Sequence, residues 1–123
     1  MHLNLNDSTM PIYQQIAQEL RTAIGEGTFA EGMQVPSTTE VSQAYQINPA
    51  TVLKGMNLLV DEGLLEKRRG LGMFVKIGAH QKVLQAKKQQ FLNQEVSKIV
   101  QEAQQLNITQ SELIKLIENQ YHR

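Results

Sequence analysis

The sequence has no cysteine and no tryptophan, and no apolar run approaches the ~20 residues that a membrane-spanning helix needs. Without cysteine, disulfides and thiolate metal sites are excluded. The first residues, MHLNLNDSTMP, carry neither the basic nor the apolar region of a secretory signal. We therefore expect a cytoplasmic protein whose 123 residues form one domain, or one small domain with an appendage.

Basic side chains are scarce in the first half of the chain. Residues 1–63 hold only Arg21 and Lys54 against seven acids, whereas residues 64–90 hold seven basic side chains against Glu66. The whole chain has a net charge of zero. A local basic block indicates contact with a polyanion better than the net charge does, and its alternative is a solvated surface. The block comprises Lys67, Arg68, Arg69, Lys76, Lys82, Lys87 and Lys88.

Residues with catalytic or metal-binding chemistry are also sparse. His2, His80 and His122 stand singly, without an acid pair at ligand spacing, so no metal site is expected. The glycines at Gly70 and Gly72 lack the following lysine and helix of a phosphate loop. No nucleophile has a recognisable base near it. We expect neither an enzyme nor a bound cofactor.

Residues 11–63 have the pattern of three helices. Apolar residues recur every fourth position in the first of them, from residue 12 to residue 24. The run Ser37-Thr-Thr-Glu40 is a capping box, in which a hydroxyl and a carboxylate satisfy the free amides of a helix start. It begins a short second helix, with Val41, Ala44 and Tyr45 predicted to face inward.

A third helix begins at Asn48 and Pro49, an N-cap residue followed by a proline suited to the first turn. Its stripe of Val52 and Met56 is predicted to face the core, and Gly55 to allow a neighbouring helix to approach. Two helices joined by a short turn form a helix-turn-helix, whose second helix enters a DNA groove.

The outward positions of the third helix are the candidates for base and phosphate contacts. Ala50 and Leu53 offer only apolar contact, for example with a thymine methyl group. Thr51, Lys54 and Asn57 are the polar candidates for the groove. The alternatives are that Thr51 caps its own helix and that Lys54 is a solvated lysine.

The basic block begins in a predicted β-hairpin, with strands over residues 64–67 and 72–77. Three helices followed by a hairpin is the order of a winged helix-turn-helix. The glycine-rich tip is thin enough for an arginine to enter a minor groove. Lys67, Arg68 and Arg69 are therefore the predicted DNA contacts of the wing, and they supply the charge that the helices lack.

From about residue 80 a heptad-like apolar stripe predicts a helix, and a second capping box, Thr109-Gln-Ser-Glu112, begins another. Two amphipathic helices cannot enclose a large core of their own, so their stripes need a partner. We favour the same tail of a second subunit over packing back on the winged helix. The predicted dimerisation residues are Leu84, Leu92, Val96, Ile99, Ala103, Leu106, Leu113 and Ile117.

The sequence resembles the GntR family of bacterial transcription regulators, and its small YtrA-type subfamily in particular. Near its end the family pattern has a G-x-G-x-F-V run, here Gly70 to Val75. Asn48-Pro49 and the short two-helix tail indicate the YtrA type. The stretches that carry the resemblance are PIYQQIAQELRTAI (11–24), VPS (35–37), INPATV (47–52) and EGLLEKRRGLGMFV (62–75).

This resemblance implies a mainly α fold with a small β-hairpin: a winged helix-turn-helix over residues 1–79 and a helical dimerisation tail over residues 80–123. It implies a homodimeric repressor that binds an inverted-repeat operator in double-stranded DNA, often at transporter genes. An effector ligand is not identified by any residue. The DNA contacts that the resemblance implies come from Ser37, Thr38, Thr39, Asn48, Ala50, Thr51, Arg69 and Gly70.

Three positions depart from the family pattern. Thr39 stands where the family usually has an arginine, and Ala50 and Leu53 replace polar side chains. Each lost bidentate contact removes ~1–3 kcal/mol of discrimination between bases. We expect an unusual operator, or heavier reliance on the wing and on DNA shape. The opposing hypothesis is a winged helix kept as a protein-interaction module, with weak or no specific DNA binding.

Overall fold

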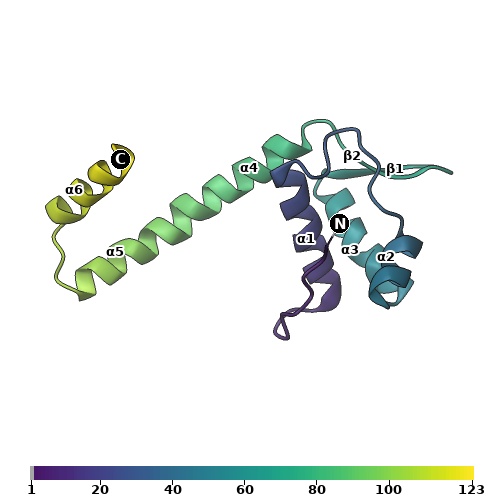
Figure 1. Ribbon diagram of the computed structural model, residues 1–123, viewed down its shortest axis with the longest axis horizontal. Helices are drawn as coiled ribbons and strands as arrows, with labels where there is room; N and C mark the ends of the chain where they lie inside the picture. Colours follow the sequence, from purple (N-terminus) through teal and green to yellow (C-terminus); the bar gives the residue numbers. More distant parts are fainter. Residues whose placement is uncertain (1) are drawn as a thin grey trace. The chain divides into compact units, whose positions relative to one another are not determined.

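Figure 1 shows the computed structural model of the chain, which describes residues 2–123. The predicted fold class, mainly helical with a small hairpin, is confirmed. No helix in this described range is both long and apolar enough to cross a membrane. The elements, in chain order, are α1 (Ile12–Glu26), α2 (Thr38–Tyr45), α3 (Pro49–Asp61), β1 (Leu65–Arg68), β2 (Gly72–Val75), α4 (Ala79–Gln90), the π-helical turn η1 (Phe91–Glu95), α5 (Val96–Gln105) and α6 (Gln110–Tyr121).

The chain divides into two compact units, one ending at Gln85 and the other beginning at Ala86. The first, called here the winged-helix unit, holds α1 to α3, the hairpin and the start of α4. The second, called the tail unit, holds the rest of α4, η1, α5 and α6. The boundary between them lies inside α4, six residues after the boundary expected at 79/80.

The core of the winged-helix unit lies where α1 crosses α3. Ile16 and Leu20 of α1 and Met56 of α3 are almost completely buried there. Gly55 lies at the crossing: a Cβ at this position would be 2.7 Å from the backbone oxygen of Tyr13. The predicted role of Gly55, to let a neighbouring helix approach, is therefore confirmed.

The helix starts follow the sequence signals. The Ser37 hydroxyl accepts from the Glu40 amide at 3.0 Å, and the Glu40 carboxylate accepts from the Ser37 amide at 3.2 Å. The side chain of Asn48 accepts from the Ala50 amide at 2.8 Å, with Pro49 in the first turn of α3. Between the two helices Gln46 adopts a left-handed backbone, with φ of 53°. The predicted helix-turn-helix is confirmed.

One inward prediction for α2 is wrong. Val41 is buried and Tyr45 is half-buried, but Ala44 is exposed. α2 has only eight residues, and Val41 is the one side chain that it fully buries. Tyr45 reaches the N-terminal segment, where its hydroxyl accepts from the amide of the buried Leu3 at 3.0 Å.

The hairpin is joined by a third backbone segment that the sequence analysis missed. In the antiparallel register Leu65 lies opposite Val75 and Arg68 opposite Gly72. Residues 33–35 pair with the other edge of β2, because Val35 N–H donates to the Met73 carbonyl at 3.0 Å and Val75 N–H to the Met33 carbonyl at 2.8 Å. A segment this short has no alternating pattern for sequence analysis to detect.

In the tail unit, the predicted break after α5 and the second capping box are confirmed. Asn107 has φ of 58°, and the Thr109 hydroxyl accepts from the Glu112 amide at 3.1 Å. The apolar stripe is not carried by one regular helix, however, because η1 inserts a π-helical turn at Phe91–Glu95. The wider π turn shifts the helical phase of the residues that follow it.

Candidate nucleic-acid interface

The outward face of α3 carries the predicted groove residues. Ala50, Leu53 and Lys54 are exposed, and Thr51 and Asn57 are half-buried, opposite the buried stripe of the same helix. An open groove of about 400 Å³ brings four of these five together and also includes an acid that the sequence analysis did not consider. The groove residues are Ala50, Leu53, Lys54, Asn57, Leu58 and Asp61.

Lys54 is held against the domain by an aromatic ring. Its ammonium lies 4.0 Å from the centre of the Tyr13 ring, on α1. A cation over a ring at an exposed site contributes about 0.5–1 kcal/mol. The lysine is therefore oriented toward α1, at one side of α3, and Tyr13 is a residue of the site that the sequence analysis missed.

The other basic side chain of the first half is paired. Arg21 of α1 donates to both carboxylate oxygens of Glu62, just after α3, at 2.6 and 2.7 Å. The hydrogen bond to Glu62 raises the pKa of Arg21. This pair joins the two helices that form the core, and it leaves Lys54 as the basic side chain on the outward face of α3.

The first turn of α2 holds the remaining helical candidates. Ser37 and Thr38 are half-buried and Thr39 is exposed. The hydroxyl of Ser37 is already engaged in the capping box, as the Asn48 side chain is in the cap of α3. Glu40 places a carboxylate in this turn, which opposes an anion near the exposed amides.

The predicted cations of the wing differ in whether they have a charged partner. Lys67, Arg68, Arg69 and Gly70 are all exposed. Arg68 donates to Glu66 Oε1 at 2.9 and 3.1 Å, and its guanidinium lies 4.1 Å from the centre of the Phe74 ring.

Within residues 2–123, Lys67 and Arg69 form no ion pair. They are therefore the wing cations with charge available to a polyanion, whereas part of the charge of Arg68 is offset by its own strand.

The described residues contain no cluster of three or more histidines and acids that could hold a metal ion.

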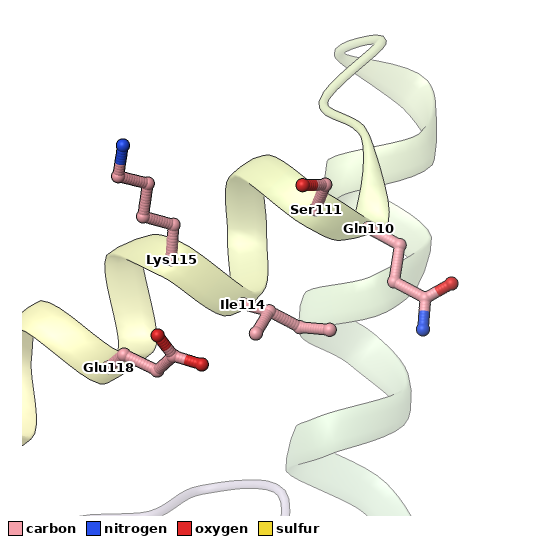
Figure 2. Close-up of a pocket in the computed structure, with 5 residues that line it drawn as sticks. All are labelled: Gln110, Ser111, Ile114, Lys115 and Glu118. Atoms are coloured by element: carbon pink, nitrogen blue, oxygen red, sulfur yellow. The ribbon is translucent and has the colours of Figure 1, made fainter.

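In the tail unit, an open groove of about 520 Å³ follows α6 and is lined by that helix alone. Figure 2 shows Lys115 and Ile114 of α6 pointing in different directions, as expected of an amphipathic helix.

A second hollow in the tail unit, of about 280 Å³, lies between α5 and α6. Its lining is mostly apolar and includes Val100, the buried Ala103 and Leu113.

Seven of the eight predicted dimerisation residues lie on α4, η1, α5 and α6, and Leu106 is the C-cap residue just after α5. Ala103 is buried and Leu113 is half-buried, whereas the other six are exposed.

Comparison with known proteins agrees with this architecture. The family model described as "Bacterial regulatory proteins, gntR family" matches residues 12–75, which run from the start of α1 to the end of β2. HTH-type transcriptional repressor NagR of Bacillus subtilis is 37% identical over 84 residues, which is 68% of this chain and 35% of NagR. HTH-type transcriptional repressor YtrA of the same organism is 32% identical over 80 residues, 65% of this chain and 62% of YtrA.

Among solved structures, the AraR DNA-binding domain in complex with operator ORE1 is similar with a TM-score of 0.53 and 28% identity. The similarity covers 61% of this chain and 93% of that one. The chain matches about a third of the length of NagR and less than two thirds of YtrA. Because the family model covers more than half of its residues, the chain belongs to the GntR family of bacterial regulatory proteins.

Proposed function

We propose that the chain is a sequence-specific, DNA-binding transcriptional repressor that acts as a homodimer on a two-fold symmetric operator. The observation that carries this proposal is the exposed wing, where Lys67 and Arg69 carry charge unpaired within the described chain. The names of NagR and YtrA as transcriptional repressors, and the AraR domain bound to an operator, support it. The role places the protein in the bacterial cytoplasm.

In this proposal α3 reads the major groove largely without charge. The exposed Ala50 and Leu53 contact thymine methyl groups, and Thr51 and Asn57 bond base edges or phosphates. Lys54, lying over Tyr13, contacts a phosphate at the groove edge rather than a base at its centre. The operator should therefore be read by few hydrogen bonds, with A·T pairs favoured under the apolar positions.

The wing supplies most of the affinity. Arg69 enters the minor groove at the glycine tip, and Lys67 contacts a neighbouring phosphate. Arginine in a narrow minor groove responds to groove width, which depends on sequence. The contact of Arg69 offsets the absence of an arginine at position 39, which is Thr39 here. The carboxylate of Glu40 also makes the first turn of α2 less favourable for binding a phosphate.

In this proposal, the tail unit of a second copy of the chain covers the exposed apolar faces of the tail unit. Leu106, the C-cap residue of α5, is 71% exposed, and Ile99 on the amphipathic α5 is 46% exposed. Exposed apolar faces of this extent usually mark an interaction surface. Dimerisation places two wings and two α3 helices on half-sites related by two-fold symmetry. Control of transporter genes stays an expectation from the resemblance.

Selection of bound duplexes from a random DNA pool tests the function directly. We expect an enriched inverted repeat whose half-sites are separated by about one helical turn, or a multiple of it. The Arg69→Ala variant should enrich the same repeat less strongly. Recovery of no shared sequence, together with salt-independent weak binding, would contradict the proposal and favour a protein-interaction module.

A further inference from the structure

The tip of the wing is held by a side chain from outside the hairpin. Gln34 lies in the segment that pairs with β2, opposite Phe74. The backbone hydrogen bonds of Met33 and Val35 to β2, on either side of Gln34, fix its position beside the hairpin. Its side chain extends toward the tip, where Nε2 donates to the carbonyl of Leu71 at 2.6 Å.

Both backbone polar groups of Leu71 are therefore bonded. Its N–H donates to the Arg68 carbonyl at 2.9 Å, closing the turn, and its carbonyl accepts from Gln34. The side chain of Leu71, in contrast, is 64% exposed. An exposed loop in which both backbone polar groups of one residue are bonded has fewer conformations than a loop held by its strands alone.

The glycine after the tip fits the same arrangement. A Cβ at Gly72 would lie 2.7 Å from Nε2 of Gln34, so a side chain there would displace the amide. Gly72 also has φ of 121°, which L-residues with side chains rarely adopt. Because Gly72 has no side chain, the Gln34 amide can occupy this space.

We propose that Gln34 is a positioning residue for DNA binding: its amide fixes the wing tip so that Arg69 enters the groove in one orientation. The inference rests on the proposed function. Without this hydrogen bond the tip must be ordered when DNA binds, and that ordering lowers affinity. Gln34 acts through Arg69, so its effect should disappear when Arg69 is absent.

The test is a double-mutant cycle on DNA affinity. Gln34→Met keeps the length of the side chain and removes the donor. With a labelled duplex that carries the repeat enriched from the random pool as the probe, we expect it to weaken binding about fivefold, as one lost hydrogen bond would. In an Arg69→Ala background the same substitution should change binding by less than about twofold. Gln81→Met, at an exposed glutamine of α4, is the matched control and should leave affinity unchanged.

A second readout needs no DNA. Backbone NMR relaxation of the unbound protein should show faster motion at residues 69–71 in Gln34→Met, with the amides of Met73 and Val75 unchanged. A rigid tip in this variant, or an equal loss of affinity in both backgrounds, would overturn the role of Gln34. If the unaltered protein enriches no shared sequence and binds no duplex, the proposed function itself fails, and the relaxation experiment still tests whether Gln34 fixes the tip.

Discussion

The winged-helix unit and the tail unit use their apolar residues in opposite ways. Among the described residues, every buried apolar side chain except Ala103 lies in the winged-helix unit. The tail unit exposes Phe91, Leu92, Ile99 and Leu106 on its own helices. The first unit is stabilised by its own contacts, whereas the second exposes apolar faces that a second copy covers in the proposed dimer. In that proposal, folding and assembly are separable properties of this chain.

The largest effect should follow a cavity in the winged-helix core. Leu59→Ala removes a side chain that is completely buried. We expect the free energy of unfolding to fall by about 2–5 kcal/mol, the usual range for a buried leucine, because lost burial and the remaining cavity both contribute. Chemical denaturation followed by circular dichroism measures it. A change below ~1 kcal/mol would mean that α3 is not packed as described.

A charge in the tail should act on assembly and spare the winged-helix unit. Ile99→Asp places a carboxylate on the exposed face of α5. If a second copy covers this face, the dissociation constant of the dimer should rise about a hundredfold, since the carboxylate must lose water on association. Sedimentation at several concentrations measures it, and the unfolding of the winged-helix unit is the control. An unchanged dimer would show that α5 lies outside the interface.

The crossing of α1 and α3 is expected to be sensitive to one added methyl group. Gly55→Ala places a Cβ against the Tyr13 carbonyl, and backbone cannot move aside as a flexible side chain can. We expect a loss of about 1–3 kcal/mol in stability from overpacking, despite the better helix propensity of alanine. Thermal unfolding measures it. A more stable variant would contradict the close approach of the two helices.

The smallest effect offers the closest comparison, because each unit contains a capping box. Ser37→Ala and Thr109→Ala each remove one cap, at a cost of about 1 kcal/mol to the helix that follows. In the first variant this loss should lower the stability of the winged-helix unit. In the second it should appear as fraying of α6 by hydrogen exchange, with the first unit unaffected. Equal loss of stability in the first unit would mean that the two units unfold together.

The sequence predicted the elements whose signals are local. The capping residues Ser37, Asn48 and Thr109, and the approach at Gly55, each follow from a residue type at one position. The hairpin strands were placed within about two residues of their observed ends.

The contacts that decide which cations are available could not be predicted in this way. Lys54 meets Tyr13 across two helices, and Gln34 reaches Leu71 over 37 residues of sequence. Arg68 lies over the ring of Phe74, which the hairpin register places opposite Glu66, two residues before Arg68; register is not read from composition. The π turn at η1 likewise has no sequence signal of its own.

The central claim is that the wing supplies more of the charge for DNA binding than α3 does. The most direct test is the salt dependence of affinity for the selected duplex, measured by fluorescence anisotropy with the unaltered protein, Arg69→Ala and Lys115→Ala. We predict that Arg69→Ala weakens binding about tenfold and lowers the slope of log K against log salt by roughly one, whereas Lys115→Ala on α6 changes neither. Unchanged affinity and slope in Arg69→Ala would contradict the claim.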